Sequence, residues 1–414
     1  MQTLSRILFF VGLLMFISNS GEAQILKKIK EKAENKILNK TEEGANKTKE
    51  EPAENNEEGG GTADEEQPSE PAAAQKSEST LSSFANYDFV PGDKIIFFYD
   101  MAGERDAEIP GRMLVNDGNV EVQSYQGEKV LLVPKNANLS MVPAMKTNNY
   151  LPEQFTLEFD VLTNGDGSES SNIELYFRTP ENASLRWSGD AKYYIRLQGI
   201  SGSQPNVDFT VNLADGNSFG GYRQFPDAAV KNQNDLWRRV AIYVNKNIGK
   251  VYVDQHRVAI VNRIEPGAGV VTFEFGNDTH PILIKNIRIA AGGSDAYNKV
   301  VTDGKFIAYG IQFDVNKSVL KPESMGTLNE IAKMMKENSD LKFEIGGHTD
   351  SDGKAELNNK LSLDRAMAVK KQLVAMGIDE SRLTTKGYGS TKPIVDNSSA
   401  ENKARNRRVE FVKK

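Results

Sequence analysis

The residues best suited to bind a ligand lie near the C-terminus, where a carboxylate precedes a polar helix face. Asp350 follows the apolar run 342–347 in a turn that contains glycine, which favours an exposed position at a sheet edge. Asn358, Ser362 and Arg365 follow at spacings of four and three, so they line one face of a helix. A carboxylate and a guanidinium that flank one cleft suit a zwitterion. The alternative is a structural ion pair between Asp350 and Arg365.

Two further groups in this region could serve either a ligand or the fold. Arg407 and Arg408 could contact carboxylates of a ligand, or they could be charges at a sheet edge that discourage aggregation. His348, Asp350 and Ser351 would be crowded on one turn, where nothing positions a base against a nucleophile. The chain has no cysteine and 3 histidines, so we predict no metal site and no cofactor.

An alternation of strands and helices predicts the fold that positions these residues. Strands are expected at residues 306–313, 342–347, 382–388 and 407–412. A first helix opens at Pro322, where the missing N–H costs nothing, and a second ends near Gly377, a plausible left-handed cap. The pattern predicts an α/β sandwich, a mixed sheet with helices on one face. The expected apolar stripes of the two helices are Met325, Leu328, Ile331, Ala332 and Met335, then Leu361, Ala366, Val369, Leu373 and Met376.

Three motifs occur in order between residues 305 and 414. They are Gly347-His348-Thr349-Asp350-Ser351-Asp352-Gly353, Asn358-x-x-Leu361-Ser362-x-x-Arg365-Ala366 and Asn406-Arg407-Arg408-Val409, accompanied by Ile311-Gln312-Phe313-Asp314, Gly387-Tyr388-Gly389 and Pro393. With these spacings, residues 305–414 closely resemble the C-terminal, peptidoglycan-binding domain of the OmpA family.

This resemblance implies non-covalent binding of peptidoglycan through meso-diaminopimelate of the stem peptide. The free amino-acid end of that residue presents an ammonium and a carboxylate, and the resemblance names Asp350 and Arg365 as the residues that hold it. Asn358 would add a side-chain hydrogen bond. The full predicted set of ligand-binding residues is Asp350, Arg365, Asn358, Thr349, Phe313, Asp314 and Arg408.

Residues 85–293 show short alternating runs separated by Gly, Asn, Asp and Pro. About ten strands without a helical period predict an all-β sandwich or barrel. The runs are shorter than the roughly ten residues of a membrane-crossing strand and are often charged on one face, which favours a soluble sandwich. Residues 236–254 weakly resemble the strand pair of a laminin-G or concanavalin-like jelly roll. The clearest runs are 94–99, 155–161, 173–177, 193–197, 209–213, 240–244, 250–254 and 271–275.

Lectin-like sandwiches of this kind often bind glycans, and some are glycosidases. Glu158 and Asp160 share a strand face and could supply the two carboxylates of a glycosidase. Residues 161–163 supply no third carboxylate, so we favour solvated strand carboxylates and predict that the protein is not an enzyme. Trp187 and Trp237 could stack on a sugar ring, but packing in the core or in a turn is the preferred interpretation.

The first 84 residues predict export and tethering. Residues 1–23 have a positive start, a short apolar core and small residues before the expected cut, as in a signal peptide. Residues 24–39 fit a basic amphipathic helix, which could lie on an anionic membrane or pair with another chain. Residues 40–84 predict a disordered acidic linker, since positions 40–80 hold 12 acidic and 4 basic residues. Residues 294–304 are expected to form a second linker.

Together these features predict an exported multidomain protein of the cell envelope, located in the periplasm or at the outer membrane. A lectin-like sandwich would be anchored to peptidoglycan by the C-terminal domain. Glycan at the sandwich and the outer membrane are further expected partners. The formal net charge is -6 and no basic face is evident, so we predict no nucleic-acid partner. The alternative is an envelope glycosidase or glycan-binding lectin that the C-terminal domain delivers to its polymer.

Overall fold

The computed structural model describes residues 87–163, 172–182, 191–200, 206–224, 237–276, 280–293, 296–314 and 316–414. The predicted signal peptide (1–23), amphipathic helix (24–39) and acidic linker (40–84) lie outside these residues, as does Trp187. Among the described helices, none combines the length and the apolar character needed to cross a membrane.

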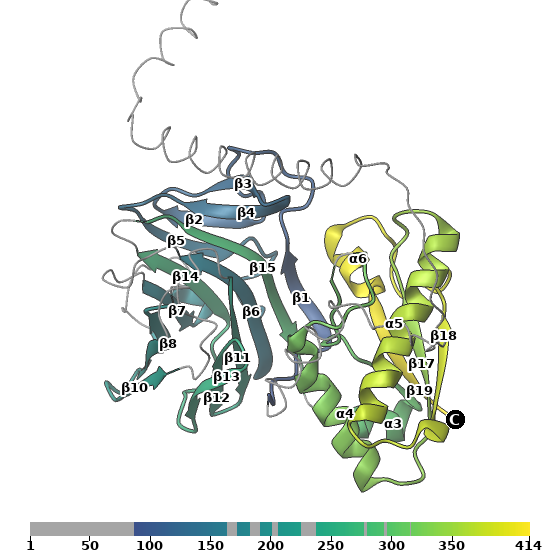
Figure 1. Ribbon diagram of the computed structural model, residues 1–414. Coiled ribbons are helices and arrows are strands. Elements are labelled where there is room, and N and C mark those ends of the chain that lie inside the picture. The colour runs from purple at the N-terminus through teal and green to yellow at the C-terminus, as the bar shows by residue number, and fades with distance from the viewer. Residues whose placement is uncertain are drawn as a thin grey trace, which may run out of the picture. The chain divides into compact units, whose positions relative to one another are not determined.

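Strands β1 to β15 form a β-sandwich of two facing antiparallel sheets (Figure 1). The eight-stranded sheet has the order β13 (His256–Val261), β12 (Ile248–Val253), β11 (Arg238–Asn245), β6 (Gln154–Thr163), β15 (Ile282–Ala291), β4 (Glu128–Val133) and β3 (Glu121–Tyr125), with β1 (Lys94–Tyr99) paired to β15. The seven-stranded sheet has the order β10 (Ser218–Gln224), β9 (Asn206–Leu213), β8 (Ala191–Gln198), β7 (Asn172–Arg178), β14 (Val270–Gly276), β5 (Asn138–Pro143) and β2 (Met113–Asp117).

The alternation of apolar and polar residues explains why these strands pack face to face. In β7, Ile173, Leu175 and Phe177 are fully buried in the core between the sheets, because side chains two apart share a strand face. All eight runs named from the sequence are strands. The predicted number of about ten strands was too low, since strands such as β10, which contains Gly220 and Gly221, carry almost no alternating signal.

The C-terminal part contains a four-stranded sheet in the order β16 (Lys305–Ile307), β19 (Arg408–Lys413), β17 (Phe343–His348) and β18 (Leu383–Gly387). Strands β17 and β18 are parallel and the other pairs antiparallel. The accompanying helices are α3 (Ala296–Asp303), α4 (Met325–Glu337), α5 (Ala355–Ala375) and α6 (Ala400–Asn406), with short 3-10 turns η3 (Pro322–Ser324) and η4 (Glu380–Arg382). Figure 1 shows α5 running along β17 and β18.

Packing against the sheet selects a somewhat different stripe of α5 from the predicted one. Ala366, Val369 and Leu373 are fully buried, as predicted, and so is the whole predicted stripe of α4. Leu361 is only partly buried because Ser362 takes the inward position beside β17. A Cβ at Gly347 would overlap the backbone oxygen of Ser362, so the glycine permits this close approach.

Three local predictions differ from the structure. The strand expected at 306–313 ends at Ile307, and Phe313 instead forms a single bridge with Leu320. Residues 294–304, expected to be a linker, contain α3, in which Val300 is buried. Helix α6 was not predicted, because it has few large apolar residues and depends on the Ser399 cap. The Gly377 cap agrees with the structure, since Ile378 N–H donates to Leu373 O at 3.1 Å and φ of Gly377 is 92°.

Candidate functional site

Asp350 is fixed in the loop that follows β17. Its Oδ1 accepts a hydrogen bond from Asp352 N–H at 3.1 Å, and its Oδ2 lies 2.7 Å from Nη1 of Arg407. Thr349 N–H donates to Gly389 O at 2.9 Å, and the Thr349 hydroxyl donates to Asp350 O at 2.9 Å. The side chain of Asp350 is 12% exposed, so one edge of the carboxylate reaches solvent.

Arg365 lies on α5, and the charges of Asp350 and Arg407 are close enough to affect its pKa. Its Nε donates to Lys317 O at 3.0 Å, and its guanidinium lies 5.0 Å from the centre of the Phe313 ring. Burial and the nearby charge of Arg407 lower the pKa of Arg365, whereas the charge of Asp350 raises it. In the part of the chain that the structure describes, Asp350 pairs with Arg407, and no ion pair within 4.0 Å joins it to Arg365.

Asn358 and Thr349 support the turn that carries Asp350. Asn358 is 8% exposed, and its Nδ2 donates to Asp352 O at 2.9 Å. Because Thr349 and Asn358 both bond to backbone atoms, their main effect is to fix the position of Asp350. Asp314 borders the cluster, with its N–H donating to Val319 O at 3.1 Å.

Arg408 lies apart from these residues. It is 5% exposed and donates to Glu410 Oε1 at 3.0 Å, Asn406 O at 3.1 Å and Lys392 O at 3.0 Å. No contact among the described residues links it to Asp350. The neighbouring Arg407 occupies that place instead, and the two arginines diverge because Arg408 begins β19. The Asn406-Arg407-Arg408 motif indicated a basic pair, but it gave no signal of which side chain turns toward Asp350.

A second polar cluster surrounds Arg408 on the sheet. His348 is 2% exposed, stacks on Tyr388 with ring centres 4.9 Å apart, and has Nε2 3.4 Å from Glu410 Oε2. Contacts with His348 and Arg408 lower the pKa of Glu410 to about 2, and burial lowers the pKa of His348. This arrangement links the paired ends of the two central strands, β17 and β19, through buried polar groups, and none of these groups contacts Asp350 among the described residues.

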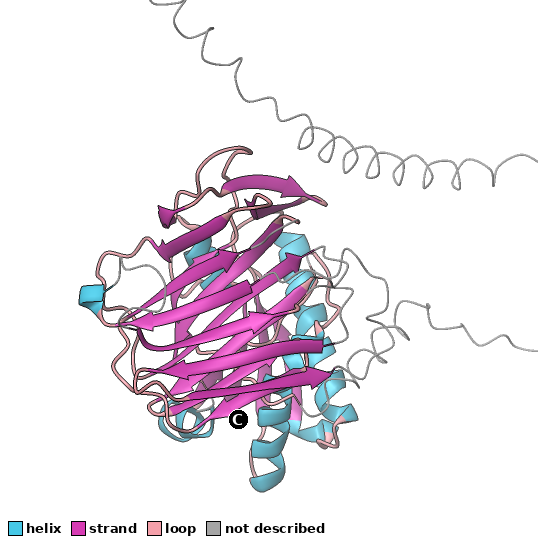
Figure 2. Cartoon of the chain, turned by 90° about the vertical axis from the view of Figure 1, so that its left-hand side faces the viewer, coloured by secondary structure: helices cyan, strands magenta, loops and turns pink. Residues whose placement is uncertain are grey.

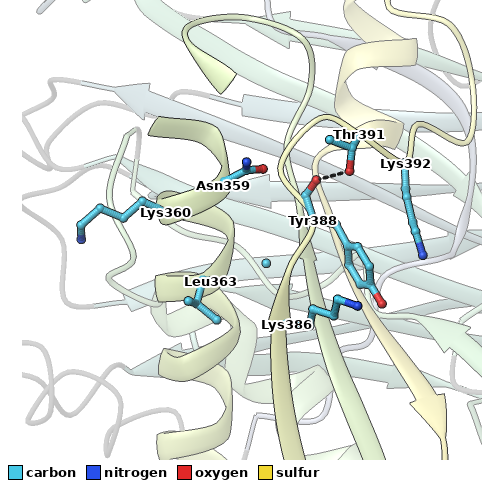
Figure 3. A pocket seen from close by; sticks show the side chains of 8 residues that line it. Asn359, Lys360, Leu363, Lys386, Tyr388, Thr391 and Lys392 are labelled. Atoms are coloured by element: carbon cyan, nitrogen blue, oxygen red, sulfur yellow. Dashed lines mark hydrogen bonds between the residues drawn. The ribbon is translucent and has the colours of Figure 1, made fainter. Parts of the chain in front are cut away.

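A shallow groove lies between α5 and β18 (Figure 3). Its volume is about 700 Å³. Lys386 and Lys392 have their ammonium groups 5.0 and 4.2 Å from the centre of the Tyr388 ring, so two positive charges adjoin one aromatic ring. Figure 3 shows Asn359 and Leu363 of α5 opposite these groups. The groove is basic and does not include Asp350 or Arg365.

The carboxylates proposed from the sequence for a glycosidase are bound to arginines. Glu158 is 0% exposed and contacts Arg239 and Arg288, the latter at 2.6 Å. Asp160 lies 3.1 Å from Arg239 and accepts from Asn286 Nδ2 at 2.6 Å. Glu158 therefore does not reach solvent, unlike the solvated carboxylate that the sequence favoured.

Trp237 packs beside the aromatic ring of Tyr125, with centres 6.3 Å apart, and beneath Lys285, whose Nζ is 4.1 Å from its ring centre. It borders a small apolar cluster made by Val130, Leu162 and Leu283. This position agrees with the packing role that the sequence favoured over stacking on a sugar.

Comparison with known proteins identifies the C-terminal region. Residues 312–407 match the model of the OmpA family. These residues form an OmpA family domain. The chain is similar to outer membrane porin F of Pseudomonas fluorescens, with 44% identity over 100 residues that cover 24% of this chain and 31% of the relative.

Two other similarities involve the same domain. The peptidoglycan-binding protein ArfA of Mycobacterium bovis is 38% identical over 102 residues, which cover 25% of this chain and 31% of the relative. The crystal structure of the peptidoglycan-associated lipoprotein from Burkholderia pseudomallei is 26% identical, with a TM-score of 0.24, and covers 25% of this chain and 88% of that one. The chain thus spans about a third of the length of the two curated relatives.

Proposed function

We propose that the OmpA family domain binds peptidoglycan non-covalently through the diaminopimelate of the stem peptide, and thereby anchors the β-sandwich in the cell envelope. The observation that carries this proposal is that Arg365, from α5, is near enough for its pKa to be affected by the charges of Asp350 and Arg407, which pair at 2.7 Å. The name of the similar protein ArfA, a peptidoglycan-binding protein, supports the same ligand.

The charges of the cluster suit the free amino-acid end of diaminopimelate. Asp350 already accepts from Asp352 N–H and pairs with Arg407, so its carboxylate is held in place before a ligand arrives. Its exposed edge would accept from the ligand ammonium, while the terminal nitrogens of Arg365 would donate to the ligand carboxylate. The three side chains sum to one positive charge, which favours a ligand that carries a further carboxylate. Under this proposal Arg407 takes the role that the sequence gave to Arg408.

The wider setting of this proposal is the envelope. Residues 1–23 would direct export, and the protein would reside in the periplasm or at the outer membrane. The similarity to outer membrane porin F supports an envelope location. We assign the sandwich to the lectin-like, concanavalin-like jelly rolls and the C-terminal part to the α/β sandwiches. We further propose a non-enzymatic role in which the sandwich binds glycan.

A sedimentation experiment tests the proposed anchor. Purified protein is mixed with insoluble peptidoglycan that contains diaminopimelate, and the fraction in the pellet is measured. The parent should sediment, and Asp350→Ala or Arg365→Ala should abolish sedimentation. Asp352→Ala is the matched control, because this acid lies in the same turn but is 64% exposed and pairs with Lys403. Peptidoglycan with lysine in place of diaminopimelate should bind poorly, since it lacks the second carboxylate. Equal sedimentation of parent and both Asp350 and Arg365 variants would refute the assignment.

A further inference from the structure

The outer face of the seven-stranded sheet carries a row of polar side chains that have no part in the proposed binding of peptidoglycan. Ser140 lies directly opposite Glu274, and Glu274 lies directly opposite Glu174. Glu174 in turn faces Arg196, and Arg196 faces Thr210. Directly opposed residues of antiparallel strands point to the same face, so these five side chains form one continuous row across β5, β14, β7, β8 and β9.

The neighbouring row on this face is aromatic and polar. Thr272, Tyr176, Tyr194 and Asn212 are opposed across four successive strands. The rings of Tyr176 and Tyr194 stack with centres 4.8 Å apart at 26°. Arg196 lies 5.9 Å from the centre of the Tyr194 ring. Tyr176 is only 2% exposed and Tyr194 is half-buried, so Tyr194 is the ring of this stack that a ligand can reach beside the charged row.

Glu174 and Glu274 are the two buried acidic residues of this face. Glu174 is 5% exposed and Glu274 is 3% exposed, although they are like charges placed directly opposite each other, which is normally destabilising. Each has a positive neighbour: Arg196 Nε lies 2.6 Å from Glu174 Oε1, and Arg178 Nη2 lies 3.5 Å from Glu274 Oε1. The Tyr176 hydroxyl donates to the other oxygen of Glu174. A fold that only had to cover its core would not need four buried or half-buried charges here.

Ser140 stands at the β5 end of the same row. The hydroxyl of Ser140 is buried, with the residue 3% exposed, and has no hydrogen-bond partner among the described residues. A buried hydroxyl without a partner costs free energy and is uncommon. Figure 2 looks onto this sheet.

We propose that this face binds a neutral saccharide, with Arg196 and Tyr194 as the contacting residues and Glu174 as the residue that positions Arg196. This inference rests on the proposed glycan-binding role of the sandwich and names its site. The two glutamates and two arginines sum to zero charge, so the face has no preference for an ion. An exposed guanidinium donor beside a half-buried tyrosine, with its ring and hydroxyl, suits a ligand that presents many hydroxyl groups on an apolar ring.

The geometry supports binding rather than bond cleavage. Both oxygens of Glu174 already have partners, one in Arg196 and the other in Tyr176. Glycoside hydrolysis needs a carboxylic acid that can give its proton to the leaving oxygen. Arg196, with 39% of its side chain exposed, and the half-buried Tyr194 are the groups that a ligand can reach.

The test is calorimetric titration of the full chain with neutral hexasaccharides of glucose, xylose, mannose or N-acetylglucosamine. At least one should bind, and Arg196→Ala and Tyr194→Ala should each weaken binding tenfold or more. Glu174→Gln, which keeps the size of the side chain, should weaken binding less. The matched control is Arg257→Ala, on the other sheet, because Arg257 is 44% exposed and pairs with Asp88 at 2.8 Å. Circular dichroism of each variant checks that the sandwich stays folded.

Two outcomes overturn this site. One is that no hexasaccharide binds the parent protein. The other is that folded Arg196→Ala and Tyr194→Ala variants bind as tightly as Arg257→Ala. The proposed peptidoglycan binding is tested separately from this site. Asp350→Ala should lose sedimentation with peptidoglycan and still bind the free hexasaccharide like the parent.

Discussion

Asp350→Asn removes the charge proposed to bind the ligand ammonium while it keeps the shape of the side chain. Asparagine can accept the same hydrogen bond from Asp352 N–H, so the turn after β17 should persist. The lost pair with Arg407 should cost about 1 kcal/mol of folding stability, because Arg407 is 39% exposed and a pair open to water contributes little. The variant should therefore fold, and its binding can be measured.

The expected loss of affinity follows from the difference between charged and neutral hydrogen bonds. A bond to a charged group contributes about 1.5–3 kcal/mol, and a neutral bond about 0.5–1.5 kcal/mol. The Asp350 side chain is only 12% exposed, which places the difference toward the upper end, at about 2 kcal/mol. That corresponds to a roughly 30-fold increase in Kd.

The assay is calorimetry with a soluble muropeptide whose diaminopimelate has a free amino-acid end, compared with the same muropeptide acetylated on that amine. Acetylation should weaken binding strongly for the parent and only slightly for Asp350→Asn, because the charge that recognises the ammonium is already gone. Asp352→Asn should behave like the parent. If acetylation weakens binding equally for parent and Asp350→Asn, the ammonium does not meet Asp350 and the reasoning fails.

Three further changes test the domain that holds this site. Gly347→Ala should lower the free energy of unfolding by at least about 2 kcal/mol, measured by urea denaturation, because the new Cβ overlaps the backbone of Ser362. Gly353→Ala meets no atom closer than 4.0 Å and is strained only by its φ of 88°, so it should cost less. Leu373→Ala should cost about 2–5 kcal/mol in the same measurement, since Leu373 is fully buried. Glu410→Gln should flatten the decline of stability between about pH 4.5 and 2. The lowered pKa of Glu410 means that the folded state binds fewer protons there, so acid favours unfolding of the parent; an unchanged acid profile would contradict this.

The sequence predicted those parts of the fold that depend on local periodicity. Leu328, Ile331 and Met335 recur at helical spacing, and all three are fully buried in α4. Positions that depend on contacts between distant parts of the chain were harder to predict from the sequence. Ser362 replaced Leu361 at the inward position because Gly347 allows the helix to approach β17, and no periodicity rule places a serine there.

The candidate sites divide in the same way. Asp350 and Arg365 belong to motifs with fixed spacing, so the sequence could pair them. The choice of Arg407 over Arg408 depends on where β19 begins, and helical or strand periodicity cannot determine that to one residue. Glu174 and Glu274 are 100 positions apart and become neighbours only through the pairing of β7 with β14. A search for paired carboxylates on a single strand instead selected Glu158 and Asp160.

Both proposed sites contain the same kind of ion pair, in which an arginine from another element binds a carboxylate. Arg407 holds Asp350, and Arg196 holds Glu174. The difference lies in the remaining charge. At Asp350 the additional Arg365 leaves a positive surplus, which suits a peptide end with carboxylates. At Glu174 the charges cancel, and the half-buried ring of Tyr194 adjoins them, which suits hydroxyl groups on an apolar ring. One chain can therefore carry a charged peptide end and a neutral sugar in separate domains without competition between the two ligands.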